Sequence, residues 1–145
     1  IELEAAGATV GLGVDGSASN DGSSMIAELR QALLIHRLRY DADEVTHIDT
    51  LRWATSGSAA CLGRNDIGEL DVGKQADLAL FRLDELRFSG AGDPIAALVL
   101  CGAQSADAVM IGGCWRVRGG QALGVDIAAL RAEHQQAARQ LQQAL

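Results

Sequence analysis

A short apolar run near the start of the chain, residues 8–14 (ATVGLGV), constrains the fold more than any other segment. It has the length and composition of a buried strand. The residues before it have the pattern of an amphipathic helix that Gly7 terminates. A polar, glycine-rich loop follows and leads into a second amphipathic segment, residues 23–40, with Ser23 or Ser24 as its expected N-cap. Helix, strand, loop and helix in this order predict an α/β fold built on parallel strands.

Side chains alternate along a strand, so the two faces of residues 8–14 differ. One face would carry Gly11 and Gly13 and then Asp15, so it is nearly bare of side chains. The other face carries the bulky residues Val10, Leu12 and Val14. Helices should pack against the bulky face, while the bare face leaves space for a ligand. Because ligands of parallel α/β folds bind beyond the carboxyl ends of the strands, Asp15 is the candidate functional residue.

The loop around Asp15 admits several interpretations. A helix-loop-helix calcium site that starts at Asp15 needs glycine at its sixth position and glutamate at its twelfth; this chain has Asn20 and Ile26 there, so the interpretation fails. The stretch GLGVDG fits a GxGxxG pattern, but apolar residues interleave its glycines as in a strand, which disfavours a phosphate-binding loop. An Asx-turn, in which Asp15 only binds backbone amides of the loop, stays open.

A third helix is expected over residues 49–62, with Gly63 ending it. Its predicted buried stripe consists of Leu51, Thr55, Ala59 and Leu62. Gly57 lies in the interior of this helix, where glycine costs about 1 kcal/mol relative to alanine. Its presence predicts a close contact between the helix and a neighbouring segment at that point.

The chain changes character after residue 64. Short β-like runs punctuated by glycine are expected at residues 78–81, 108–111 and 115–118. The single proline, Pro94, is assigned to a loop, and residues 126–145 are assigned to a polar terminal helix. A small β layer is therefore expected to follow the helical first part.

Composition and charge exclude several classes of function. The 145 residues are 48% hydrophobic, which suffices for a core. No apolar run approaches the roughly 20 residues of a membrane helix, so no membrane partner is expected. The net charge of −7 disfavours nucleic-acid binding. We expect the widely spaced Cys61, Cys101 and Cys114 to be buried, reduced thiols of a cytoplasmic protein.

Four motifs, taken in chain order, resemble one known family. They are VGLGVDGSASND, MIAELRQALL, ATSGSAACLG and IGELDVGKQADLALF. In this order they resemble the last third of the amidohydrolase superfamily. The chain looks most like the branch of metal-dependent aminohydrolases that includes the 8-oxoguanine deaminases, and the resemblance extends through essentially its whole length.

The resemblance implies a fold and a division of the chain. Residues 1–64 would be the end of a (β/α)8 barrel, with residues 8–14 as its last strand. Residues 65–125 would form the C-terminal part of a small β-sandwich, and residues 126–145 a C-terminal helix. Because such a barrel alone takes about 250 residues, upstream segments would be required, and this chain by itself is expected to be inactive.

The resemblance also implies a reaction, the hydrolytic deamination of an oxopurine-like ring, with 8-oxoguanine favoured. Asp15 would lie beside one divalent metal, zinc or alternatively iron. A metal lowers the pKa of its bound water toward neutrality. The resulting hydroxide would attack the amino-bearing ring carbon, and Asp15 would shuttle the proton to the leaving ammonia. Ser17 and Ser19 would contact the substrate, or alternatively bond only to the backbone of their own loop.

The histidines of this chain do not complete the metal site. His36, His47 and His134 follow no apolar strand, so the resemblance places the metal-binding histidines outside this chain. The expected partners are a small heteroaromatic substrate and further copies of the protein in a homo-oligomer. Hydrolysis of a triazine, isoxanthopterin or adenosine-type ring is the alternative activity, and a non-catalytic structural or assembly domain is the alternative class.

Overall fold

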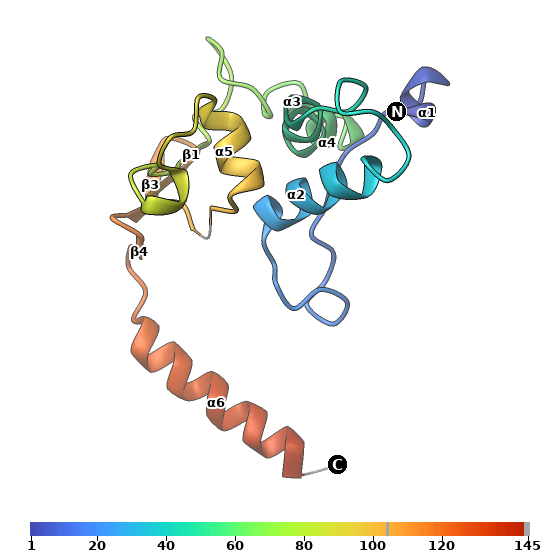
Figure 1. Ribbon diagram of the computed structural model, residues 1–145. Helices are drawn as coiled ribbons and strands as arrows, with labels where there is room; N and C mark the ends of the chain where they lie inside the picture. The colour runs from blue at the N-terminus through green and yellow to red at the C-terminus, as the bar shows by residue number, and fades with distance from the viewer. Residues whose placement is uncertain (104, 144–145) are drawn as a thin grey trace.

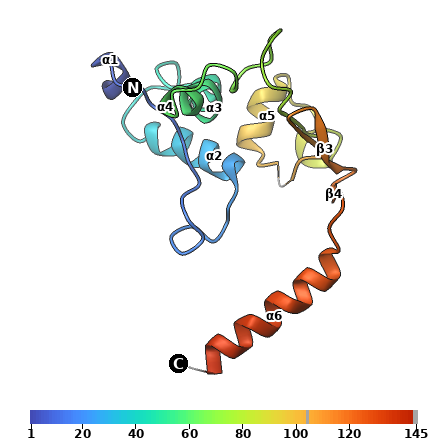
Figure 2. The same ribbon diagram turned by 180° about the vertical axis from the view of Figure 1, so that it is seen from behind.

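The computed structural model describes residues 1–103 and 105–143. The helices within residues 2–61 lie close together, while the strands lie beside α5 (Pro94–Leu100) (Figure 1). The view from behind shows α6 (Ile127–Gln143) extending away from the other elements (Figure 2). The mixed α/β character is therefore confirmed, whereas the predicted division at residues 64 and 125 stays a prediction.

The first two helices begin close to where the sequence predicts, but the second ends at His36, four residues before its predicted end. Helix α1 spans Glu2–Ala5, and Gly7, at a φ of 84°, follows it. Helix α2 spans Met25–His36, and the Ser24 hydroxyl accepts a hydrogen bond from the backbone N–H of Ala27 at 3.4 Å. Ser24 is therefore the N-cap of α2.

The predicted third helix consists of three pieces. They are α3 (His47–Arg52), the π-helical turn η1 (Trp53–Gly57) and α4 (Ser58–Cys61). Helix α3 starts earlier than predicted because Thr46 and Asp49 form a capping box at its N-terminus. Gly63, at a φ of 66°, follows the last piece as predicted.

The π-helical turn changes which residues of this helix are buried. A π-helical turn contains more residues than an α-helical one, so it rotates everything that follows. The predicted stripe is therefore wrong at two positions: Thr55 is exposed, and Leu62 is 72% exposed. The buried residues are Thr50, Trp53 and Ala59.

Trp53 and the leucines of α2 form the main core. The buried residues of this cluster are Leu29, Leu33, Val45, Trp53 and Val99. Val10 and Leu12 pack against the cluster from residues 8–14, so the bulky face of this segment meets the helices as predicted. The segment is extended, but among the described residues it pairs with no strand, since the four strands, which lie within residues 78–122, pair only with one another.

The backbone of residues 10–12 crosses the third helix at very short range. A Cβ atom on Gly57 would lie 2.4 Å from the carbonyl oxygen of Val10, so the close contact predicted at Gly57 is confirmed. A Cβ atom on Gly11 would lie 2.8 Å from the Cα of Ser58. The prediction that Gly11 lines open space is therefore wrong, because its missing side chain makes room for the helix. Gly13 does have open space beside it.

The strands form one antiparallel sheet in the order β1-β2-β3-β4. Their bounds are Leu78–Leu80, Ala108–Ile111, Cys114–Arg118 and Gln121–Ala122. Met110 of β2 lies opposite Leu78 on one side and Trp115 on the other, and the register shifts between Val109 and Met110. The three predicted β runs are confirmed to within one residue at each end.

A short helix, α5 (Pro94–Leu100), occupies the segment that the sequence assigns to a loop around Pro94. The Asp93 carboxylate caps it, accepting from the backbone N–H groups of Ile95 and Ala96 at 2.8 and 3.0 Å. Proline directly after such a cap is a helix start, so the loop assignment is wrong. Val99 of α5 joins the core around Trp53, and this connects α5 to the first helices. A 3-10 turn, η2 (Leu86–Phe88), precedes it.

The terminal helix, α6, spans Ile127–Gln143 and has no buried residue. The last two residues of the predicted helix, 144–145, lie outside the described residues. Within the described ranges, none of the helices combines the length and apolar character that crossing a membrane would require.

The cysteines correct another prediction, because Cys61, Cys101 and Cys114 are free but all exposed. Each lies at the end of an element: the last residue of α4, the C-cap of α5 and the first residue of β3. The expectation that these cysteines are buried, which rests on the general tendency of free cysteine, is therefore wrong for all three.

Residues 64–77 form a loop held by one carboxylate. Two nitrogens of the Arg64 guanidinium donate to Asp66 at 2.9 and 2.6 Å, and Gln75 Nε2 donates at 3.3 Å. The hydrogen bond from Arg64, supported by that from Gln75, lowers the pKa of Asp66 to about 2.

Replacing Gly57 by alanine tests the backbone crossing. The new Cβ atom would overlap the Val10 carbonyl oxygen, so we expect Gly57→Ala to destabilise the intact protein by about 2–3 kcal/mol, despite the better helix propensity of alanine. Urea unfolding measures this change. Gly92→Ala is the matched control, because a Cβ atom there has no neighbour within 4 Å. Equal stability of the two variants would contradict the crossing.

Replacing Asp66 by asparagine tests the loop contact. The folded pKa of about 2 lies below the ordinary value of about 4, so the contact stabilises the fold above about pH 4 and is lost as pH falls toward 2. We therefore expect the difference in urea midpoint between the parent protein and Asp66→Asn to be largest above pH 4 and to vanish near pH 2. The exposed Asp43→Asn variant serves as control. A difference that does not change with pH would refute this assignment.

Candidate functional site

Asp15 lies where the extended segment ends and the loop toward α2 begins. Its side chain is exposed, and its Oδ1 accepts a hydrogen bond at 2.7 Å from the backbone N–H of Gly16. The loop that follows projects away from the helices (Figure 1). The structure therefore places Asp15 at the end of the extended segment, as expected.

The backbone of Asp15 adopts a left-handed conformation, with a φ of 62°. Few residues other than glycine tolerate this region, and aspartate and asparagine are among them. This conformation turns the chain sharply, so that the carboxylate leaves the line of the extended segment. The hydrogen bond to Gly16 is a local one to the N–H of the next residue, whereas an Asx-turn would use the N–H two residues on. It leaves the second carboxylate oxygen available.

The serines after Asp15 lie in an exposed turn. Ser17 and Ser19 are both exposed, and the backbone N–H of Ser19 donates to the Gly16 carbonyl at 2.9 Å. Asn20 closes the loop, because its Nδ2 donates to Glu28 at 2.6 Å and its Oδ1 accepts from the N–H of Gly22 at 3.1 Å. The structure thus brings both serines into the same loop as Asp15.

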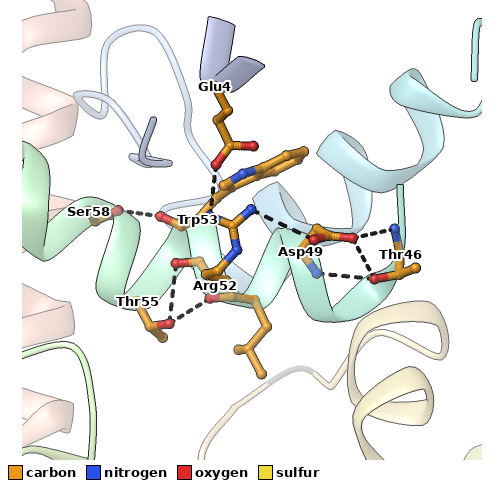
Figure 3. Close-up of polar contacts among 8 residues, drawn as sticks. Glu4, Thr46, Asp49, Arg52, Trp53, Thr55 and Ser58 are labelled. Atoms are coloured by element: carbon orange, nitrogen blue, oxygen red, sulfur yellow. Dashed lines mark hydrogen bonds and ion pairs between the residues drawn. The ribbon is translucent and has the colours of Figure 1, made fainter. Parts of the chain in front are cut away.

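The serine at position 58 ties the extended segment to the third helix, and sequence reasoning missed it. Its Oγ lies 2.8 Å from the Leu12 carbonyl oxygen, 2.8 Å from the Trp53 carbonyl oxygen and 3.1 Å from the Leu12 nitrogen. Figure 3 shows the contact between Ser58 and the backbone of Trp53. Its only sequence signal was the row of small residues around Gly57.

A chain of charged residues joins α1 to α3 beside this contact (Figure 3). Arg52 Nη1 donates to Glu4 at 2.8 Å, and Arg52 Nη2 lies 3.7 Å from Asp49. The hydrogen bond from Arg52 lowers the pKa of Glu4 by more than partial burial raises it. Burial acts to raise the pKa of Asp49, but hydrogen bonds from Thr46 and the nearby Arg52 hold it below its usual value. These carboxylates are therefore held ionised as structural groups.

Asp15 would fit a metal as a single oxygen ligand. Within residues 1–103 and 105–143, no group of three or more His, Cys, Asp or Glu side chains could hold a metal ion. The histidines of the helical part are engaged elsewhere: His36 Nδ1 lies 2.8 Å from the Ala32 carbonyl oxygen, and His47 Nε2 lies 3.0 Å from Asp93. His134 is exposed on α6. An exposed carboxylate at a segment end suits zinc as a ligand, and further ligands would have to come from elsewhere.

The sequence profile of the amidohydrolase family matches residues 1–116. This chain therefore belongs to the amidohydrolase family. The sequence-based resemblance to that family is confirmed.

Two curated relatives show where in the family the similarity lies. The chain is 64% identical to the 8-oxoguanine deaminase of Pseudomonas aeruginosa over 97% of its length, which is 31% of that protein. It is 41% identical to a 5-methylthioadenosine/S-adenosylhomocysteine deaminase of Pelotomaculum thermopropionicum over 97% of its length, 33% of that protein. The chain thus spans about a third of the length of these relatives.

Solved structures agree with the sequence comparison. An adenosine deaminase from Xanthomonas campestris with bound zinc matches with a TM-score of 0.87 and 32% identity, over 97% of this chain and 33% of that one. The atrazine chlorohydrolase of Arthrobacter aurescens in complex with zinc matches with a TM-score of 0.84 and 38% identity, over 91% and 30%.

Substitutions at Asp15 should separate its chemistry from its conformation. Asparagine also tolerates the left-handed region, and the side chain is exposed. We therefore expect Asp15→Asn to change the free energy of unfolding by less than about 0.5 kcal/mol. A β-branched residue is unfavourable there, so Asp15→Val should cost about 1–2 kcal/mol. Urea unfolding of the intact protein measures both, and a large loss in Asp15→Asn would show that the carboxylate is structural.

Proposed function

We propose that this chain supplies the last third of a metal-dependent aminohydrolase that deaminates an oxopurine-like ring, with 8-oxoguanine favoured. The observation that carries the proposal is the 64% identity to an 8-oxoguanine deaminase over 97% of the chain. On this proposal, residues 8–14 are the last strand of a (β/α)8 barrel within residues 1–64. Residues 65–125 are part of a β-sandwich, and residues 126–145 are a terminal helix. The TM-scores of 0.84 and 0.87 to family members support it.

The packing and the unpaired backbone of the extended segment support its assignment as a barrel strand. Its bulky face packs on the helical core, as a barrel strand packs on its outer helices, and its backbone makes no strand pairing among the described residues. A strand in this state needs neighbours to satisfy its remaining N–H and C=O groups. Segments outside this chain would provide them in the intact enzyme.

Asp15 would be one ligand of a divalent metal, with zinc favoured because two similar structures carry it. The bound metal would supply acidity to water, lowering its pKa toward neutrality. The Asp15 carboxylate would take one proton from the attacking water as the C–O bond forms at the ring carbon. It would then give that proton to the amino nitrogen as the C–N bond breaks and ammonia leaves. The carboxylate ends the cycle as it began.

Ser17 and Ser19 would contribute to substrate binding in this scheme. They are exposed in the turn directly after Asp15, so a ring that reaches the carboxylate would pass close to them. Their hydroxyl groups can donate to a ring carbonyl or accept from a ring N–H. Local hydrogen bonding within the loop is the alternative role.

An amino-substituted triazine is the second candidate substrate. The chain is 38% identical to the atrazine chlorohydrolase structure. It is also 44% identical, over 63% of its length, to a hydroxydechloroatrazine ethylaminohydrolase of Pseudomonas sp.. Both ring types present a substituted carbon between ring nitrogens, so the same proton transfer would serve either.

Ammonia release by the intact protein tests the proposal. We expect turnover of 8-oxoguanine to exceed that of guanine, isoxanthopterin and an aminotriazine. Removal of metal with a chelator should abolish turnover, and zinc should restore it. Inactivity toward all four compounds by a zinc-loaded protein would refute the substrate class and favour a non-catalytic structural domain.

Asp15→Asn tests the proton transfer, since the amide cannot accept the proton. We expect kcat to fall by about 10²–10⁴-fold, while the stability measured by urea unfolding stays near that of the parent protein. The exposed Asp43→Asn variant is the charge-matched control and should keep full activity. Full activity of Asp15→Asn would rule out its catalytic role.

A further inference from the structure

We propose that Ser58 is a positioning residue that sets where the Asp15 carboxylate lies. This inference rests on the proposed function of Asp15. Ser58 acts through the backbone of Leu12, three residues before the carboxylate, and it has no part in proton transfer itself.

The Ser58 hydroxyl is the centre of a small hydrogen-bond cluster. Its Oγ lies 2.8 Å from the carbonyl oxygens of both Leu12 and Trp53, and 3.1 Å from the Leu12 nitrogen. A hydroxyl group has one proton to donate and lone pairs to accept with. It therefore accepts from the Leu12 N–H while donating to one of the two carbonyls. The Leu12 N–H also reaches the Trp53 carbonyl at 3.1 Å.

These contacts take the place of strand pairing at Leu12. The third helix accepts a hydrogen bond from the Leu12 N–H, and the Leu12 carbonyl accepts one from the helix when the Ser58 proton points to it; partial burial of the site makes an unsatisfied group costly. The position of the segment relative to the core therefore depends on a side chain. Most strands are held instead by a continuous backbone ladder.

The π-helical turn η1 places the Ser58 hydroxyl beside the backbone of Leu12. Backbone N–H groups at its C-terminal end, where Ser58 is the cap, donate to the carbonyls of Trp53 and Thr55. The turn presents Ser58 and the Trp53 carbonyl together to the extended segment. Such turns are frequent at functional sites.

Close backbone approaches at two glycines flank this hydrogen-bond cluster. The two backbones come this close because both positions are glycine: a Cβ atom added to Gly11 would lie 2.8 Å from the Cα of Ser58, and one added to Gly57 would lie 2.4 Å from the Val10 carbonyl oxygen. Any retreat breaks the hydrogen bonds of Ser58. The hydrogen bonds of Ser58, formed where glycine lets the two backbones approach, thus fix the position of Leu12.

That position is passed on to Asp15 over a short distance. Only Gly13 and Val14 intervene, and among the described residues no side chain outside the segment hydrogen-bonds to either. The contacts at Leu12 are therefore the last side-chain hydrogen bonds to the segment before the left-handed turn at Asp15. Loss of the Ser58 hydroxyl should let the carboxylate shift, and a displacement of about 1 Å can cost up to about 10²-fold in rate.

Ser58→Ala in the intact zinc-loaded protein is the test, with Thr55→Val as the matched control. Thr55 lies on the same turn, but its hydroxyl bonds only to its own helix, at 2.7 Å from the Leu51 carbonyl oxygen. We expect Ser58→Ala to lower kcat about tenfold with KM changed less than twofold. Thr55→Val should keep kcat within twofold. Ser58→Cys, with a weaker donor of similar size, should give an intermediate kcat and replaces the alanine variant if that does not fold.

A double-mutant cycle with Asp15→Asn makes the test specific. If Ser58 acts through Asp15, Ser58→Ala should cause no further loss of kcat in the Asp15→Asn protein. The same proportional loss in both backgrounds, or no loss in either, would overturn the positioning role. Full activity of Asp15→Asn alone would instead refute the proposed function of Asp15 and the positioning role with it.

Hydrogen exchange of the metal-free intact protein adds a readout that does not depend on activity. The Leu12 amide should exchange several-fold faster in Ser58→Ala than in the parent protein or in Thr55→Val. An unchanged exchange rate of the Leu12 amide in Ser58→Ala would contradict the hydrogen-bond cluster and overturn the inference.

Discussion

The close crossing of residues 10–12 with the turn from Trp53 to Ser58 is the contact on which the rest of the structure depends. Glycine on each side makes it possible, because a Cβ atom on Gly11 or Gly57 would collide with the opposing backbone. The same turn is approached from another side by Gly68, where a Cβ atom would lie 2.9 Å from the Cα of Ser56. The extended segment and the loop that leads to the sheet thus both pack against one helical turn.

The extended segment is held at its start and its middle and is left open at its end. Helix α1 precedes it and is tied to α3 through Glu4 and Arg52. Such partly exposed ion pairs contribute little stability, so their role here is orientation. The apolar face then packs on the core around Trp53, and Ser58 holds Leu12. Asp15 and the loop that follows it project beyond these restraints.

Local signals predicted most elements, because caps and glycine stops act over a few residues. Ser24, Gly7 and Gly63 mark helix ends where expected, and the β runs at residues 78–81 and 108–111 form strands. Helix α5 was missed because its seven residues show too little periodicity. The π-helical turn was missed because it adds a residue that no local pattern signals, and this changed the buried face from Thr55 to Trp53.

The sequence by itself determined the family, the position of Asp15 at the end of the extended segment and the face of residues 8–14 that packs on the helices, since each follows from residue type and alternation. The tertiary structure alone decided what the glycines are for. Gly11 seemed from alternation to leave space for a ligand, yet it makes room for Ser58. It also decided that a serine hydroxyl accepts the Leu12 N–H, where none of the described strands pairs with it. Contacts between residues 46 positions apart arise only when the helices pack, so no local pattern could have predicted them.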